Sequence, residues 1–427
     1  MRFGSTPWLL AVAVIATLSL ANSLADDWPQ WRGPNRDGRS AETGISKDWK
    51  NQPPRHLWTV GGMGRGFASL AIVDGRVYTT GNVGSGQSVI CVDASTGAPI
   101  WTTPVTNGAP RHDYAGSRST PTVDGDRVYV VSSDGGIACL KTSDGNVVWK
   151  RPFSDFGGRM MSGWGYSESP LVDGNLVVCT PGGNDAMMVA LDKNTGKDVW
   201  RCPMPRGGDQ GGDGAGYSSI VISNGGGVKQ YVQIVGRGLI GVRASDGKFL
   251  WGYNKVANGT ANIPTPLVSG DYVFASTGYG AGAGLVKLSK RGDAVEPKED
   301  YFLDGQVFQN HHGGMVLVGD YVYTGNGHGN GFPTCLNWKT GKIKWGGKRR
   351  GPGGGSAAVT LVGDQLLFRY ENGVIGLISA TPDGYRLNGE FTPEYQEAES
   401  WSHPVVVDGK MYLREQDKLM CYDVKAQ

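Results

Sequence analysis

The chain has almost no excess of charge of either sign. Its 427 residues include 41 basic and 39 acidic side chains, and the formal net charge is +2. A nucleic-acid-binding protein usually carries a basic patch or stripe on one face. The densest basic cluster, Lys348-Arg349-Arg350, is typical of a solvated loop. We therefore expect no nucleic-acid partner.

Long apolar runs are also scarce. The longest extends from Trp8 to Leu20, follows Arg2 and precedes Ser23-Leu24-Ala25. These three parts are typical of a secretory signal, so we predict a signal peptide over residues 1–25. The run is short for a membrane span, although an uncleaved anchor is the alternative. We expect a periplasmic or secreted protein with no membrane span after cleavage.

Cysteine is infrequent and never occurs in pairs. The chain has six cysteines, none adjacent to another, and it contains no Cys-x-x-Cys-His sequence. Covalent attachment of a c-type haem requires that sequence, so a bound haem of this type is excluded.

Tryptophan, in contrast, recurs in a fixed motif. A small residue is followed by Asp or Asn, then by Gly, and finally by Trp. The five copies of the motif end at Trp101, Trp149, Trp200, Trp251 and Trp345. The copy from Ala190 through Asp192 and Gly196 to Trp200 is the clearest. No helical period produces this spacing, which indicates strands joined by tight turns.

A second motif precedes each copy, in which apolar residues lead into a tight turn and an alternating strand. Such a pattern is typical of a β-hairpin. The turn glycines are Gly75, Gly125, Gly174, Gly225, Gly270, Gly319, Gly363 and Gly409. Their spacing of about 44–51 residues indicates a propeller or a solenoid. We predict an all-β fold, an eight-bladed β-propeller of four-stranded antiparallel blades.

The last repeat unit is incomplete. It stops after residues 419–423 without an outer strand, whereas residues 56–60 resemble the outer strand at residues 100–104. We predict that this N-terminal strand closes the ring, which removes free sheet edges. The predicted organisation is an N-terminal extension over 26–55 and the propeller over 56–427, as a monomer.

Four cysteines share one position of the repeat. Cys91, Cys139, Cys335 and Cys421 each take the place of the small residue, which we expect to pack under the neighbouring blade's tryptophan. A disulfide requires Cα atoms within about 7 Å, so cysteines in different blades are predicted to be buried free thiols. Cys179 and Cys202 share one blade, and for them a disulfide stays open.

The candidate site lies in the loops that connect one blade to the next. Such loops gather at one mouth of a propeller's channel, where ligands usually enter. Their polar and aromatic side chains favour a polar, anionic or planar ligand, with arginines for charge, tryptophan (Trp164 or Trp401) for stacking and Glu168 as acceptor or base. Alternatively, these side chains only bridge neighbouring blades. The predicted ligand-binding residues are Arg118, Trp164, Glu168, Asn262, His312 and Arg350.

Metal ligation is not predicted. His311, His312 and His328 lie in one repeat unit. Adjacent residues of a strand point to opposite faces, so only one of His311 and His312 is expected to face the channel. Asp209 and Asp213 are too few for a calcium site.

The two motifs together resemble the PQQ-like β-propeller repeat family, named after pyrroloquinoline quinone (PQQ), over nearly the whole mature chain. The opening Trp28-Pro29-Gln30-Trp31-Arg32-Gly33-Pro34 is similar to exported planctomycete members. The family includes quinoprotein alcohol dehydrogenases and a non-enzymatic scaffold lipoprotein of outer-membrane barrel assembly. The resemblance implies the fold more strongly than an activity.

The chain departs from both kinds of member. The resemblance implies a pair of adjacent bridged cysteines above the quinone in dehydrogenases and a lipid-bearing cysteine in the scaffold, and the chain has neither. It also implies a calcium held by Glu and Asn, for which Glu168 and Asn262 are candidates. We predict a propeller that binds a small polar ligand or an envelope protein partner. The alternative is a PQQ-dependent dehydrogenase of an alcohol or sugar, with PQQ and calcium as cofactors and Glu168 as catalytic residue.

Overall fold

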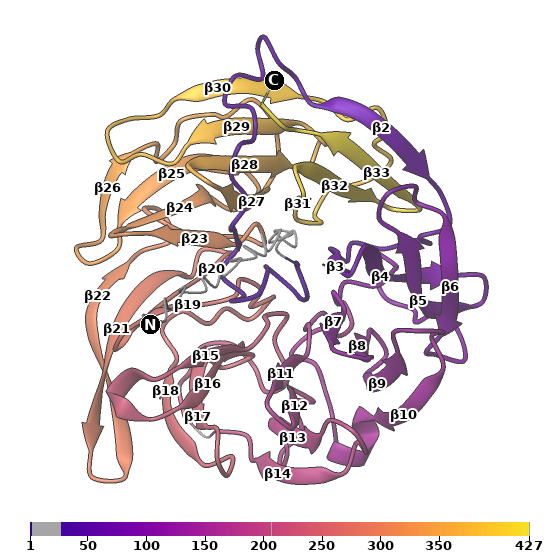
Figure 1. The fold of residues 1–427 in the computed structure, drawn as a ribbon. Coiled ribbons are helices and arrows are strands. Elements are labelled where there is room, and N and C mark those ends of the chain that lie inside the picture. The colour runs from indigo at the N-terminus through magenta and orange to yellow at the C-terminus, as the bar shows by residue number, and fades with distance from the viewer. Residues whose placement is uncertain (2–26, 206, 427) are drawn as a thin grey trace.

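The computed structural model describes Met1, residues 27–205 and residues 207–426. These residues form eight antiparallel sheets around a central axis (Figure 1). The predicted eight-bladed propeller of four-stranded blades is therefore confirmed. The predicted signal peptide, apart from Met1, lies outside the described residues. No helix in the described part of the chain is long and apolar enough to cross a membrane.

Each of the first four blades runs from a short inner strand to an outer strand at the rim. The strands are β3 (Ala71–Val73), β4 (Arg76–Val83), β5 (Gly86–Asp93) and β6 (Pro99–Pro104); β7 (Thr122–Asp124), β8 (Arg127–Ser132), β9 (Gly136–Lys141) and β10 (Val147–Pro152); β11 (Leu171–Asp173), β12 (Leu176–Cys179), β13 (Met188–Asp192) and β14 (Asp198–Cys202); and β15 (Val221–Ser223), β16 (Gln230–Val235), β17 (Gly238–Arg243) and β18 (Phe249–Tyr253).

The last four blades follow the same order, with the exception that the eighth takes its outer strand from the N-terminus. The strands are β19 (Leu267–Ser269), β20 (Tyr272–Thr277), β21 (Gly282–Arg291) and β22 (Ala294–Leu303); β23 (Met315–Val318), β24 (Tyr321–Asn326), β25 (Phe332–Asn337) and β26 (Lys342–Trp345); β27 (Ala357–Val362), β28 (Gln365–Tyr370), β29 (Ile375–Ser379) and β30 (Leu387–Phe391); and β31 (Val405–Val407), β32 (Lys410–Glu415), β33 (Lys418–Asp423) and β2 (Arg55–Val60). Within the described residues, two short 3-10 helices span Phe153–Phe156 and Gly225–Gly227.

The ring closes where β2 pairs with β33. The two strands are antiparallel, and Trp58 lies opposite Cys421. This is the relation that Trp101 has to Cys91 in the first blade. The predicted closure by an N-terminal strand is confirmed, and β33 gains a hydrogen-bonded neighbour on its outer edge.

The turn of the repeat motif explains the choice of its residues. The Asp192 side chain accepts hydrogen bonds from the backbone N–H and the hydroxyl of Thr195, at 2.9 and 2.8 Å. Gly196 then adopts a φ of +68°, which glycine tolerates best. After this turn, Trp200 lies opposite Ala190 of its own blade. The small residue thus faces its own blade's tryptophan, which differs from the predicted contact with the neighbouring blade.

The tryptophan instead reaches the turn of the following blade. Trp149 donates its indole hydrogen to the carbonyl of Lys193, at 3.0 Å. Its ring lies so close to Gly196 that a Cβ there would be 2.7 Å from the ring. Trp101 and Trp200 make the same kind of contact with Gly145 and Gly247. The repeated glycine therefore serves both the turn and the contact between blades.

Replacing Gly196 by alanine is expected to destabilise the fold by about 2–4 kcal/mol, since it adds backbone strain and overpacks the Trp149 ring. Gly174 is a matched control. Its φ is +61°, but a Cβ there meets nothing within 4 Å. We expect Gly174→Ala to cost only about 1 kcal/mol. Urea unfolding of both variants would measure the difference, and equal losses would contradict the proposed contact.

All six cysteines are buried and free. Burial raises the pKa of the Cys91, Cys202, Cys335 and Cys421 thiols to about 12. Cys179 and Cys202, for which a disulfide was left open, are not bridged. The thiols are therefore protonated at neutral pH and pack as small apolar groups.

The N-terminal segment crosses the middle of the ring, where Figure 1 draws it in indigo. Trp28 exchanges two backbone hydrogen bonds with Ile72 of β3, both 2.8 Å long. Further along, Arg36 donates to the carbonyl of Ser169 at 2.6 Å. Strand β1 (Arg39–Ser40) then adds to β27 as a fifth, parallel strand. The segment is thus tied to inner parts of several blades.

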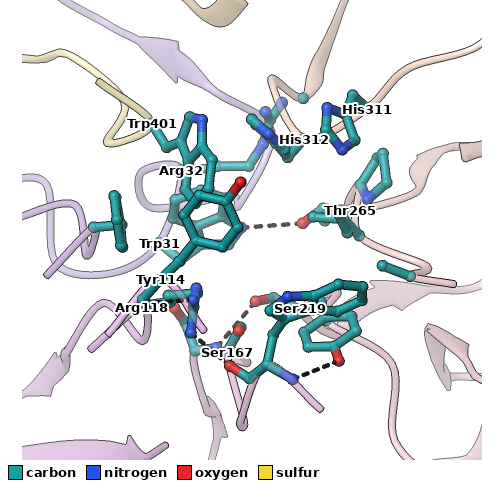
Figure 2. Close-up of a pocket in the computed structure, with 18 of the residues that line it drawn as sticks. Trp31, Arg32, Tyr114, Arg118, Ser167, Ser219, Thr265, His311, His312 and Trp401 are labelled. Atoms are coloured by element: carbon teal, nitrogen blue, oxygen red, sulfur yellow. Dashed lines mark hydrogen bonds between the residues drawn. The ribbon is translucent and has the colours of Figure 1, made fainter. Parts of the chain in front are cut away.

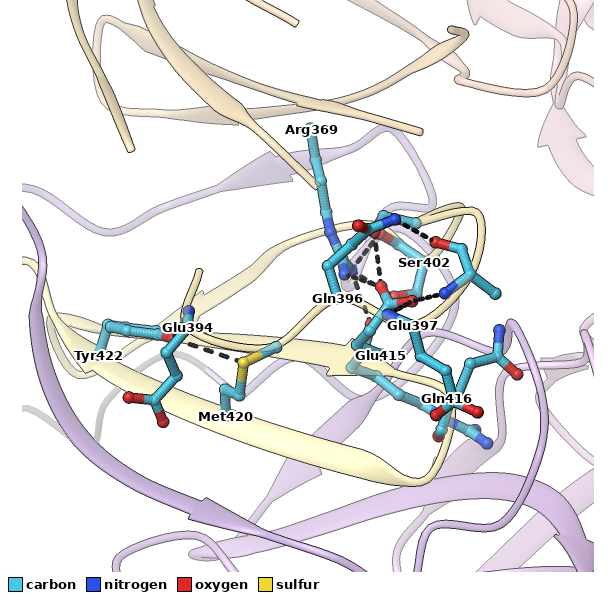
Figure 3. Close-up of polar contacts among 12 residues, drawn as sticks. Arg369, Glu394, Gln396, Glu397, Ser402, Glu415, Gln416, Met420 and Tyr422 are labelled. Atoms are coloured by element: carbon cyan, nitrogen blue, oxygen red, sulfur yellow. Dashed lines mark hydrogen bonds and ion pairs between the residues drawn. The ribbon is translucent and has the colours of Figure 1, made fainter. Parts of the chain in front are cut away.

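A buried ion pair links the seventh and eighth blades (Figure 3). Arg369 of β28 and Glu415 of β32 are 2.8 Å apart, and each side chain is 1% exposed. Glu415 also accepts hydrogen bonds from the Ser400 hydroxyl, at 2.5 Å, and the Ala398 N–H, at 3.1 Å. Arg369 also donates to the Ser402 hydroxyl, at 2.6 Å. Each charge is thus compensated by its partner and by further hydrogen bonds of this cluster, whereas the Arg369 Nε has no partner among the described residues.

Candidate binding cavity

A cavity of about 260 Å³ lies where segments that precede the inner strands of several blades come together (Figure 2). Polar loop residues and aromatic rings share its wall. The lining residues are Trp31, Arg32, Phe67, Tyr114, Arg118, Trp164, Ser167, Ser169, Tyr217, Ser219, Ala261, Ile263, Pro264, Thr265, Tyr279, His311, His312, Gly314 and Trp401.

A second cavity, of about 650 Å³, is lined in part by residues of the inner strands. Its lining includes Val172, Ile222 and Leu267. Each of these residues comes two or three positions after a residue that lines the first cavity. The N-terminal segment contributes to both cavities, through Trp31 to the first and Arg36 to the second. Residues 30–36, which border both cavities, are named the floor.

The floor places two side chains in the first cavity. Trp31 donates its indole hydrogen to the Thr265 hydroxyl, at 3.0 Å. Arg32 is 2% exposed and donates to the carbonyls of Asp37 and Met315. Burial lowers the pKa of Arg32 to about 10. Sequence reasoning missed both residues, although a Trp-Arg pair in a segment outside the repeat is a signal that could have found them.

Arg118 supplies a second positive charge at the cavity. Its guanidinium donates to the carbonyls of Trp164, at 2.6 Å, Tyr114, at 2.7 Å, and Asp113, at 3.1 Å. Burial lowers its pKa to about 10, so the side chain is cationic at neutral pH. Among the described residues that line the cavity, none carries a carboxylate. The cavity wall thus holds positive charge without a matching negative one.

Aromatic rings surround this charge. The Arg118 guanidinium lies over the Phe67 ring, 5.6 Å from its centre. The Trp401 ring is 4.5 Å from Phe67 and 5.0 Å from Tyr114, between ring centres. On another side, Trp164 and Tyr217 are 6.0 Å apart. Such rings provide flat apolar surfaces for a planar ligand.

Both adjacent histidines line the cavity, which corrects the prediction that only one faces the channel. The prediction assumed a strand, but His311 and His312 lie in the loop before β23, where side chains need not alternate. Their ring centres are 4.0 Å apart, and His328 lies 4.0 Å from His311. Burial and, to a smaller extent, the nearby His328 lower the pKa of His311 to about 3.

The structure brings three of the six predicted ligand-binding residues to the cavity, namely Arg118, Trp164 and His312. Arg350 is exposed and is not among the lining residues. Asn262 is fully buried and donates to the carbonyls of Val235 and Gly236, both at 3.0 Å. Its side chain joins backbone segments rather than facing the cavity.

Glu168 is also buried, behind the cavity wall. It accepts hydrogen bonds from the N–H of Thr180, at 2.6 Å, from the Thr180 hydroxyl, at 2.9 Å, and from Gln233, at 3.2 Å. Burial raises its pKa to about 8, although these hydrogen bonds and the charge of Arg36 act in the opposite direction.

The residues present do not fit the calcium that the resemblance implies. Calcium takes six to eight oxygen ligands, chiefly from carboxylates and carbonyls. Glu168 and Asn262, the two candidates, use their polar atoms on other parts of the protein, and no carboxylate lines the cavity within the described residues. The two arginines and the aromatic rings do fit a planar anion, which is the chemical class of PQQ itself.

Comparison with known proteins places the chain in a family. A family model described as outer membrane protein assembly factor BamB matches residues 47–156 and 115–347. The chain belongs to this PQQ-like β-propeller repeat family. A quinoprotein ethanol dehydrogenase of Pseudomonas putida is 29% identical over 153 residues, which are 34% of this chain and 24% of that protein. BamB of Burkholderia pseudomallei is 26% identical over 199 residues, 45% of each chain.

The matches to these family members are partial in sequence and extensive in fold. The chain spans about a quarter to just under half of the length of these two curated relatives. The quinohemoprotein alcohol dehydrogenase of Comamonas testosteroni superposes with a TM-score of 0.66 at 14% identity, covering 94% of this chain and 81% of that one. At this identity the likeness concerns the fold alone.

Proposed function

We propose that this propeller binds a small planar anion in the first cavity. The observation that carries the proposal is the Arg118 guanidinium, held among aromatic rings in a cavity whose described lining has no carboxylate. Arg118 is partly buried, and a cation withdrawn from water is costly unless a negative group compensates it. A carboxylate, sulfonate or phosphate of a ligand would supply that compensation through charge-assisted hydrogen bonds.

The shape of the cavity supports a planar rather than a globular anion. Trp164 and Trp401 both line the cavity together with Arg118, and each offers a flat face. The volume of about 260 Å³ suits a small organic molecule. Arg32 in the floor is a further anchor for negative charge.

Arg118→Gln is expected to weaken the binding of PQQ, a planar tricarboxylate, by about 10–100-fold, because a hydrogen bond to a charged group contributes about 1.5–3 kcal/mol. Quenching of tryptophan fluorescence during titration would measure the affinity, since three tryptophans line the cavity. Binding should also weaken as the pH rises through about 10, where Arg118 loses its proton.

Arg350→Gln is the matched control, because Arg350 is exposed and lies outside the cavity lining. It should leave the affinity unchanged. Naphthalene-2,6-dicarboxylate, a planar anion without a quinone, tests whether shape and charge suffice. Equal weakening in both arginine variants, or no saturable binding of either probe by the wild-type protein, would contradict the proposal.

The dehydrogenase alternative is tested in the same samples. The raised pKa of Glu168 is the observation that favours it, since a general base acts best near the working pH. We expect no dye-linked oxidation of ethanol or glucose with PQQ and calcium, because Glu168 is hydrogen-bonded behind the cavity wall. Oxidation that Glu168→Gln abolishes would establish the dehydrogenase.

We also propose that the protein is exported, acts in the periplasm or outside the cell, and is a monomer. The predicted signal peptide and the matched outer membrane protein assembly factor support this location. The name of that relative indicates that it works with other envelope proteins. We therefore propose an envelope protein as the alternative binding partner for the loops that connect the blades.

A further inference from the structure

Three potential metal ligands meet at the side of the first cavity where the sixth and seventh blades adjoin. His311 and His312 precede β23 in the sixth blade, and Glu371 follows β28 in the seventh. Each residue offers one ligand atom, and these atoms all lie within 4.8 Å of one another. Figure 2 shows the two imidazoles beside each other at the cavity.

The imidazole of His312 has a ring nitrogen without a hydrogen-bond partner among the described residues. This nitrogen is Nε2, and the side chain is only 13% exposed. The Glu371 Oε1 lies 3.4 Å from this nitrogen. A neutral imidazole can present the lone pair of one ring nitrogen to a metal ion, and the Nε2 of His312 has no hydrogen bond that a metal would have to break.

The other two ligands are held by neighbouring groups. The Nδ1 of His311 contacts the Ser356 hydroxyl at 2.9 Å, which orients the ring. The Glu371 Oε1 accepts a hydrogen bond from the Trp401 indole at 3.0 Å. Such outer contacts are common around metal-binding histidines and carboxylates. The Nε2 of His311 contacts the Tyr279 hydroxyl at 3.1 Å, and this partly exposed tyrosine can turn away.

A glycine leaves room for the carboxylate. Gly355 has a φ of +82°, and a Cβ at this position would lie 2.2 Å from the Glu371 Oε2. Any side chain here would therefore displace Glu371 from the histidines. The backbone conformation and the close approach both require glycine.

We propose that His311, His312 and Glu371 form a binding site for a divalent first-row transition-metal ion, with Zn²⁺ as the best fit. Two imidazoles and one carboxylate are a common zinc set that keeps one position open. With bonds of about 2.0–2.1 Å, ligand atoms around a tetrahedral ion are about 3.4 Å apart, so small side-chain rotations suffice. The open position would face the cavity that both histidines line.

Calorimetric titration of the metal-free chain with Zn²⁺ is expected to show one saturable site per molecule. His311→Ala and Glu371→Gln should each weaken the affinity at least 10-fold, because each removes one of three ligands. Co²⁺ should give the visible absorption of a four-coordinate ion in the wild-type protein, and this absorption should be lost in both variants. The Co²⁺ spectrum reports the coordination directly.

His56→Ala is the matched control. His56 lies 2.8 Å from Glu394, a second histidine–carboxylate pair, but on the exposed strand β2. It should leave zinc binding unchanged. Arg118→Gln should also retain zinc while it loses PQQ, so that failure of one proposal is distinguishable from failure of the other. Glu371→Gln keeps the size of the side chain, and its melting temperature checks the fold. Zinc binding that survives in His311→Ala and Glu371→Gln, or no stoichiometric binding, would overturn the site.

Discussion

Replacing Glu415 by alanine is expected to lower the free energy of unfolding by about 3–5 kcal/mol, because the change leaves a buried arginine without its counter-charge. Arg369 and Glu415 are each 1% exposed, and the pair joins two blades next to the closure of the ring. The Ser400 hydroxyl and the Ala398 N–H would lose their acceptor at the same time. Chemical unfolding monitored by tryptophan fluorescence would measure the loss.

The matched control is an exposed ion pair of similar length. Lys47 and Asp364 are 2.6 Å apart, but their side chains are 62% and 61% exposed. Water and salt screen such a pair, so Asp364→Ala should change the stability by less than about 1 kcal/mol. A small effect at Glu415, similar to that at Asp364, would show that the buried pair is not needed for the contact between blades.

Removal of residues 27–60 should abolish cooperative folding. The truncated chain lacks β2, which leaves the β33 edge unpaired. It also lacks Trp49, which packs in the core between the seventh and eighth blades. Thermal unfolding followed by circular dichroism would show a sharp transition for a chain that starts at residue 27 and none for a chain that starts at residue 61.

A complementation experiment tests whether residues 27–60 are needed for folding. A peptide of residues 27–60 added to the truncated chain should restore part of the transition, because the missing strand pairs through its backbone. An unchanged melting temperature in the truncated chain would contradict the role of β2 in closing the ring.

The fold was predictable because the same turn and strand sequence recurs in most repeat units. The motif that includes Asp192, Gly196 and the following tryptophan recurs with similar spacing. The structure predicted for one copy therefore applies to the other copies as well. The missing outer strand of the last unit then required a partner, and residues 56–60 carried the right pattern. The path of the N-terminal segment through the ring could not be predicted, because that segment has no repeat to compare with.

The candidate site was predictable only in part. Position in a loop indicated Arg118, Trp164 and His312, which line the cavity, but equally Asn262 and Arg350, which do not. The sequence indicates which residues lie in loops near the mouth of the central channel. The direction of each side chain, in contrast, depends on the conformation of its loop. Asn262 turns toward carbonyls of the neighbouring blade, a contact that no spacing encodes.

The N-terminal floor also sets the order in which the molecule can assemble. Trp31 bonds to a residue 234 positions away, and Arg32 to one 283 positions away. Trp31 and Arg32 are therefore synthesised long before the residues to which they form hydrogen bonds. Contacts of such sequence separation slow folding and leave strand edges unprotected in the meantime. We infer that the cavity is among the last parts to form, so a chain that fails to finish the ring is never able to bind.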